Sequence, residues 1–137
     1  MSEFSKKYRE KLLPGQQHAF AGTDPEFIQI FESFAFDEVI HQGNLDDRTR
    51  FMAILAALLG CQGLEEFKMM LPAALNMGVT PVEVKEIVYQ SAAYLGIGRV
   101  FPFLKAGNEE PTSRGISLPL EGQSTTTPET PLTAGNQ

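Results

Sequence analysis

The sequence lacks tryptophan and has only one cysteine and two histidines among its 137 residues. A single cysteine cannot form an intramolecular disulfide, which is usual for proteins of reducing compartments. Neither histidine has the neighbouring cysteines, histidines or acids that a metal site requires. The glycine-containing segment GIGR also lacks the lysine and the preceding strand of a phosphate-binding loop. These absences predict a cytoplasmic protein that carries no metal ion and no organic cofactor.

Basic residues are also scarce. There are 11 Lys and Arg against 17 Asp and Glu, so the net charge is -6, and the basic residues are scattered rather than aligned on one face. We therefore expect neither nucleic acid nor an anionic membrane as a partner. The longest apolar run, residues 51–59, is too short to span a bilayer. The opening MSEFSKKYREKLLPG has no apolar core or cleavage site, so we expect no signal or transit peptide.

No long segment alternates between apolar and polar residues with a period of two, whereas every long segment fits the helical period of 3.6. The sequence therefore predicts an all-α fold. Asp24, Asp46 and Thr80 are placed as N-terminal caps, and TPVE at Thr80 has the pattern of a capping box. The helix that contains residues 51–59 is apolar almost all round and is expected to be buried. The expected helices run from residue 24 to 41, from 46 to 59, from the break at 60–63 to 78, from 80 to 95 and from 99 to 108.

Composition divides the chain into three parts. Residues 1–23 form a lead-in that contains His18, which we expect to be exposed, and residues 24–109 form the helical domain. Residues 110–137 are rich in proline, threonine, serine and glycine and predict an extended or disordered tail. The alternative is an arm that lies on a neighbouring subunit, with Ile116, Leu118 and Leu120 as its anchors.

The segments FAFDEVIHQGNLDDRTR and ALNMGVTPVEVKEIVYQSAAYLGIGR, together with the stretch from Gly60 to Gly78, resemble the carboxymuconolactone decarboxylase family, which shares its fold with alkylhydroperoxidase D. The resemblance covers about residues 24–108. It implies a helical bundle that assembles as a homotrimer or homohexamer. The family includes γ-carboxymuconolactone decarboxylases, thiol-dependent peroxidases and members of unknown role. The tail GISLPLEGQSTTTPET also resembles the linker of two-copy members, so the chain resembles the first half of such a protein.

The resemblance makes Cys61 and Met70 informative. Relatives of the thiol-dependent branch carry two cysteines three residues apart, then a histidine on the same helix, with a glutamate on the preceding helix. Cys61 fills the first position, but no second thiol follows, and the family histidine falls at Met70. A thioether cannot transfer protons, and a dithiol cycle needs a resolving thiol, so peroxidase activity is disfavoured. Cys61 is either an activated thiol ahead of a helix or, as we favour, a small buried apolar residue.

The resemblance also places Glu38 at the family's helix glutamate. Glu38 and His41 lie three residues apart and share a helix face, so the carboxylate is positioned to orient the imidazole for proton transfer. The alternative is a surface pair near a helix end. In decarboxylase-like relatives the region of Arg48 and Arg50 lies near substrate carboxylates, and a guanidinium suits carboxylate recognition. Arg50 is the better candidate because it is closer to the buried run, although both arginines also fit a salt-bridged helix start.

Pro72 adds a mechanical feature to the helix of Met70. Inside a helix, proline removes one backbone hydrogen bond and predicts a kink that widens a pocket beside Met70. Alternatively, Pro72 marks the true start of that helix.

Two hypotheses follow. In the first, the protein is a decarboxylase-like lyase that acts on a small carboxylated lactone or related acid. Glu38, His41 and Cys61 are then the candidate catalytic residues, and Arg50 and Met70 contact the substrate. In the second, it is a catalytically impaired oligomeric binding or scaffold protein of the same family.

Overall fold

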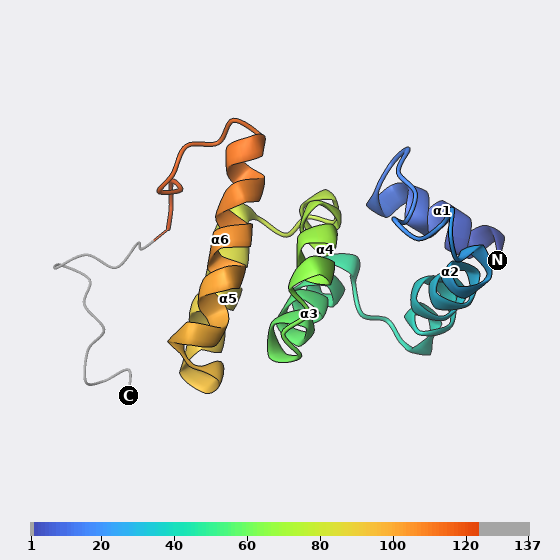
Figure 1. The fold of residues 1–137 in the computed structure, drawn as a ribbon, viewed down its shortest axis with the longest axis horizontal. Helices are drawn as coiled ribbons and strands as arrows, with labels where there is room; N and C mark the ends of the chain where they lie inside the picture. Colours follow the sequence, from blue (N-terminus) through green and yellow to red (C-terminus); the bar gives the residue numbers. More distant parts are fainter. Residues whose placement is uncertain (1, 124–137) are drawn as a thin grey trace, which may run out of the picture.

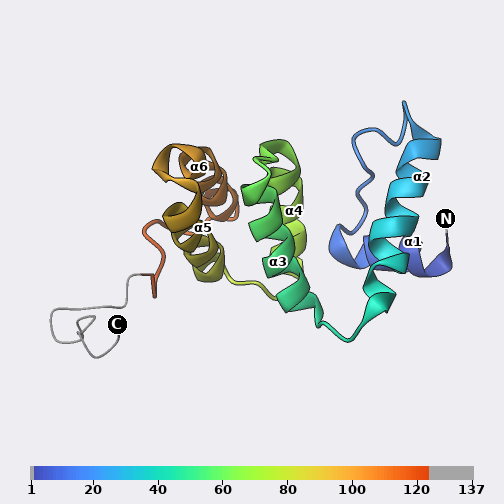
Figure 2. The ribbon, with the colours of Figure 1, turned by 90° about the horizontal axis from the view of Figure 1, so that it is seen from below.

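The computed structural model describes residues 2–123, and these residues form six α-helices and no β-strand. The helices are arranged in three pairs that stand side by side in a row, as Figures 1 and 2 show, and α1 crosses α2 at a steep angle. The pair α1 and α2 lies at one end, α3 and α4 form the middle, and α5 and α6 form the other end. The all-α prediction is therefore confirmed.

The helix bounds follow from local sequence signals. Asp46 caps α3 by accepting a hydrogen bond from the backbone N–H of Thr49 at 3.0 Å, and Thr80 and Glu83 form a complete capping box on α5. After the π-helical turn η1 and the short 3₁₀ turn η2, the chain reverses at Gly43. The elements are α1 (Glu3–Leu12), α2 (Pro25–Ser33), η1 (Phe34–Glu38), η2 (Ile40–Gln42), α3 (Asp47–Gly60), α4 (Leu64–Asn76), α5 (Pro81–Leu95) and α6 (Ile97–Ser113).

Most of the core lies between the middle pair and the pair α5 and α6, and it continues to Tyr8, Leu12 and Phe36 at the first pair. Phe51, Leu55 and Leu59 recur every four residues on α3 and are completely buried. Phe67 of α4 meets Phe103 of α6 edge to face, with ring centroids 5.1 Å apart. This packing joins the two pairs of helices into one body.

Three expectations about the helices need correction. The lead-in contains α1, whose Tyr8 and Leu12 are buried, because apolar residues at Phe4, Tyr8 and Leu12 repeat at helical spacing behind the cap Ser2. The helix α6 continues beyond Asn108 to Ser113, so the first residues assigned to the tail are its last turn.

The third correction concerns α3, which is not buried all round. Its alanines at 53, 56 and 57 are exposed, because only one face of the helix meets the core.

Pro72 lies inside α4 rather than at its start.

The residues after α6 are described as far as Gln123. Leu120 is buried against its own chain, and its N–H donates to Oε1 of Gln123 at 2.6 Å. Ile116 and Leu118 are about 40% exposed. Of the three expected anchors, Leu120 is therefore held within the chain itself. The remainder of the expected tail, residues 124–137, lies outside the described residues.

Candidate functional site

A cavity of about 420 Å³ lies between the first pair of helices and the middle pair. Its walls are almost entirely apolar, and many of the side chains are aromatic, which is typical of sites for small organic molecules. Four polar residues interrupt this lining: Tyr8, His18, Arg50 and Glu66. The apolar lining residues are Phe20, Phe27, Ile28, Phe31, Ala35, Phe36, Ile40, Phe51, Ile54, Leu58 and Met70.

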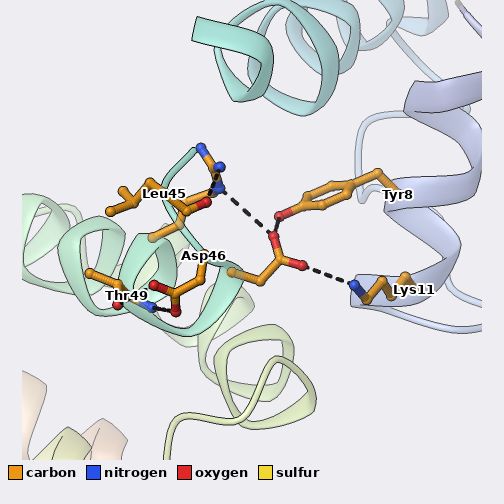
Figure 3. Close-up of polar contacts among 7 residues, drawn as sticks. Tyr8, Lys11, Leu45, Asp46 and Thr49 are labelled. Atoms are coloured by element: carbon orange, nitrogen blue, oxygen red, sulfur yellow. Dashed lines mark hydrogen bonds and ion pairs between the residues drawn. The ribbon is translucent and has the colours of Figure 1, made fainter. Parts of the chain in front are cut away.

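Arg50 is the cation of this cavity. It lies in the first turn of α3, where its Nη2 donates to the backbone oxygen of Leu45 at 2.7 Å (Figure 3). Its Nε is buried and makes no hydrogen bond within residues 2–123. The nearest acid, Asp47, has its Oδ1 at 3.8 Å from Nε, which is an ion-pair distance but too long for a hydrogen bond. Arg50 therefore has a buried Nε–H whose hydrogen-bonding capacity is not used by the described residues.

Asp47 connects this region to α1. The Tyr8 hydroxyl donates to Oδ1 at 2.5 Å, and the Lys11 ammonium donates to Oδ2 at 2.9 Å (Figure 3). Burial alone raises the pKa of Asp47, but the hydrogen bonds from Tyr8 and Lys11 outweigh it and hold the pKa below its usual range. Burial and the hydrogen bond to Asp47 raise the pKa of Tyr8. The phenol therefore remains protonated and serves to position Asp47 beside Arg50.

Met70 lies in the cavity wall and is only 6% exposed. Glu66 stands one turn before it on α4 and borders the same cavity, because residues four apart share a helix face. Both residues, together with His18, also border a smaller adjoining hollow of about 190 Å³. Arg50 and Met70 thus line one cavity, and their contact with a substrate stays a prediction.

His18 is only partly exposed, so the expectation of an exposed histidine in a lead-in is wrong. The connection between α1 and α2 folds over the cavity mouth and brings His18 and Phe20 into its wall. The local sequence gave no sign of this, since the position depends on how α1 and α2 pack. Tyr8 and Glu66 were missed for the same reason, although the spacing of Glu66 and Met70 on one helix was a usable signal.

Glu38 and His41 do not form the expected pair. His41 is held by Asp37, whose Oδ1 and backbone oxygen both lie 2.8 Å from Nδ1 of the imidazole. Side chains three and four residues apart can both meet on a helix, and in the observed backbone Asp37, not Glu38, reaches the ring. Glu38 is exposed and borders neither the aromatic cavity nor the smaller hollow beside it.

His41 and Arg50 share a different hollow, outside this cavity. Both border a shallow surface depression of about 710 Å³, which also contains Tyr8, Asp46 and Asp47. The imidazole packs against the ring of Phe4, with centroids 4.4 Å apart. His41 does not line the aromatic cavity, although Tyr8, Ile40 and Arg50 border both spaces. Its catalytic role, like that of Glu38, stays a prediction from the sequence.

Cys61 is exposed at the end of α3, so the favoured interpretation of a small buried residue is wrong. Its thiol lies 3.6 Å from the backbone oxygen of Leu58, and it borders none of the hollows that hold Arg50 or Met70. The structure therefore does not bring Cys61 together with Glu38, His41 or Arg50.

The described part of the chain contains no group of three or more His, Cys, Asp or Glu side chains arranged to hold a metal ion. None of the helices in that part is long and apolar enough to cross a bilayer.

Residues 25–109 match the sequence profile of the Carboxymuconolactone decarboxylase family, and this match covers more than half of the chain. The chain belongs to this family. It is similar to a 4-carboxymuconolactone decarboxylase of Acinetobacter baylyi (strain ATCC 33305 / BD413 / ADP1), with 33% identity over 72 residues. The similar region is 53% of this chain and 54% of the relative, so it spans about half the length of each protein.

Proposed function

We propose that this protein is a decarboxylase-like lyase that acts on a small carboxylated lactone or a related acid. Family membership and the decarboxylase relative support the reaction class. The observation that carries the proposal is Arg50, a cation in the wall of a largely apolar cavity, whose buried Nε makes no hydrogen bond within the described residues. A buried donor without a partner is costly, and a ligand carboxylate in the cavity removes that cost.

Arg50 binds a carboxylate that the substrate keeps. Holding the departing carboxylate would stabilise the ground state and slow the reaction, because only stronger binding of the transition state accelerates a step. The aromatic walls surround the lactone ring and exclude water. The bond between the ring carbon and the departing carboxylate breaks, carbon dioxide leaves, and the electron pair moves onto the conjugated lactone carbonyl oxygen. A proton from water then replaces the carboxylate on carbon. This balance requires no metal and no organic cofactor.

The test measures carbon dioxide release from a conjugated five-membered lactone with two carboxylates. Arg50→Met removes the charge and the Nε–H, and we expect KM to rise at least tenfold; Arg50→Lys keeps the charge but loses the planar fork and recovers only part of the loss. Arg114→Met is the matched control, because Arg114 pairs with Glu110 at the surface and borders none of the described hollows that contain Arg50. Equal turnover by Arg50→Met and the wild type contradicts the proposal.

A catalytically impaired binding protein is the second candidate. The observations that favour it are the thioether of Met70 in the cavity wall and the absence of a second thiol in a sequence with one cysteine. This function predicts that carboxylated lactones bind, that binding depends on Arg50, and that no carbon dioxide is released. Isothermal titration with the same lactone, followed by a carbon dioxide assay on the same sample, separates the two candidates.

Self-association forms part of the proposal. Phe27, Ile30 and Phe34 lie along one face of α2 and η1 with exposed fractions of 64%, 66% and 58%. Exposed apolar surface of this kind is typical of interaction sites, and the family resemblance implies a homotrimer or homohexamer. Light scattering after size exclusion tests this directly. The proposal predicts a mass several times that of the chain, and Ile30→Asp should reduce it.

A further inference from the structure

His18 has no assigned role, yet it stands in the wall of the cavity that we propose to bind the acid. Three other polar residues line this cavity: Tyr8, Arg50 and Glu66. Glu66, as a carboxylate, only accepts hydrogen bonds. Tyr8 donates to Asp47, and Arg50 is a permanent cation. Met70 offers only a thioether, which donates no proton. An imidazole is therefore the one neutral ring in this wall that combines a strong donor with an acceptor.

The ring of His18 is held in a defined orientation. The backbone N–H of Phe20 donates to Nδ1 at 3.1 Å. An acceptor nitrogen carries no proton, so the neutral ring in this hydrogen bond has its proton on Nε2. The ring also meets Phe31 edge to face and lies tilted against Phe20, with centroid distances of 6.2 and 5.6 Å. Both aromatic residues line the same cavity.

The remaining nitrogen is available to a ligand. Within residues 2–123, no hydrogen bond or ion pair joins Nε2 of His18 to another group. His18, Glu66 and Met70 border both the cavity and the smaller hollow beside it, so the imidazole stands at the junction of these spaces. A neutral imidazole is a weak acid but an effective hydrogen-bond donor to an oxygen that gains negative charge.

We propose that His18 is a catalytic residue whose Nε2–H donates a hydrogen bond to the lactone carbonyl oxygen as carbon dioxide leaves. No proton is transferred from the ring. The electron pair released from the breaking carbon–carbon bond collects on that oxygen, and the hydrogen bond strengthens as the charge grows. The proton that finally enters the carbon comes from water. This inference rests on the proposed function, since it assigns a role to a second group in the cavity that contains Arg50.

The first test uses turnover. His18→Phe keeps an aromatic ring but removes the donor, and loss of one such donor lowers kcat by about 100-fold, with little change in KM. His18→Gln keeps an N–H donor and recovers part of the rate. Thr23→Ala is the control for disturbance of the connection between α1 and α2, because Thr23 bonds only to its neighbours Phe20 and Asp24. An unchanged kcat in His18→Phe, with the wild type active, overturns the inference and leaves the proposed function standing.

The second test does not depend on turnover. The protein has two histidines, so ¹⁵N-histidine labelling gives two imidazole spin systems, and His41 serves as an internal reference outside the cavity. The probe is a saturated γ-butyrolactone carboxylate, which has the carboxylate and the carbonyl but cannot lose carbon dioxide through a conjugated ring. We expect the free protein to show His18 as the neutral Nε2–H tautomer. Addition of the probe should shift the Nε2 signal of His18 and leave that of His41 in place.

The outcomes distinguish a failure of the role of His18 from a failure of the proposed function. A shift of His18 that disappears in Arg50→Met supports both the acid site and the role of His18. Binding that depends on Arg50 but leaves His18 unshifted, or shifts His41 instead, overturns the inference alone. No binding of the probe at any concentration overturns the proposed function, and the inference with it.

Discussion

The hydroxyl of Tyr8 lies 2.5 Å from Oδ1 of Asp47 and joins α1 to the first turn of α3 (Figure 3). Asp47 in turn is the acid closest to the buried Nε of Arg50. A residue from a helix that the sequence did not predict therefore helps to set the position of the proposed carboxylate-binding group.

Tyr8→Phe tests this connection. The substitution removes the hydroxyl but keeps the ring, so we expect the free energy of unfolding to fall by about 1–2 kcal/mol. Urea denaturation measures the change. Tyr94→Phe is the matched control because Tyr94 is 84% exposed, and it should leave stability unchanged. Equal midpoints for the two variants contradict the importance of the hydrogen bond.

The ion pair between Arg9 and Glu32 gives a stronger test of how α1 is held against α2. Glu32 is only 2% exposed, and its Oε2 lies 2.9 Å from Nε of Arg9. Arg9→Met leaves a buried carboxylate without a counter-charge and should destabilise the protein by about 3 kcal/mol. Adding Glu32→Leu should recover most of this loss. A double variant as unstable as Arg9→Met alone contradicts the role of the uncompensated Glu32 charge. Lys68→Met, which breaks an exposed ion pair, serves as the control.

Because Lys85 is buried, we expect it to make the free energy of unfolding depend on pH in the alkaline range. It is buried beside Asn108, to which its ammonium donates, and burial lowers its pKa below the ordinary value of 10.5. Between the folded pKa and 10.5 the unfolded chain binds more protons than the folded one, so this residue makes stability rise with pH in that window. Lys85→Met should therefore stabilise the protein at neutral pH, and the advantage should shrink as the pH approaches 10.5.

Thermal unfolding across pH 7 to 10.5 measures this difference. An exposed lysine substituted in the same way, Lys105→Met, should show no such trend. A constant difference between Lys85→Met and the wild type over the whole range contradicts the role of burial.

Cys61 allows a test of the disfavoured peroxidase activity. The thiol is exposed, the sequence contains no second cysteine, and Met70 cannot transfer protons. We expect no peroxide reduction with added thiols above that of Cys61→Ser. Robust turnover that disappears in Cys61→Ser would show that an intermolecular thiol completes the cycle. The assay should follow peroxide consumption, because added thiols oxidise slowly by themselves.

Local signals decided most of the fold. The apolar spacing along α3 to α6 and the caps at Asp46 and Thr80 act within a few residues, so the helices that follow could be predicted from the sequence alone. The candidate Arg50 could also be predicted, since it stands in the first turn of a capped helix next to an apolar run.

The composition of the site was decided by the tertiary structure. Whether Glu38 or Asp37 reaches His41 depends on the backbone of a π-helical turn, and sequence spacing alone did not distinguish them. His18 enters the cavity wall only because the first pair of helices and the middle pair pack together, which brings the connection between α1 and α2 to the cavity. Contacts between residues far apart in the chain arise from packing, which periodicity and capping do not encode. The sequence by itself therefore determined the helices α3 to α6 and the family, and only the folded chain determined which side chains share a cavity.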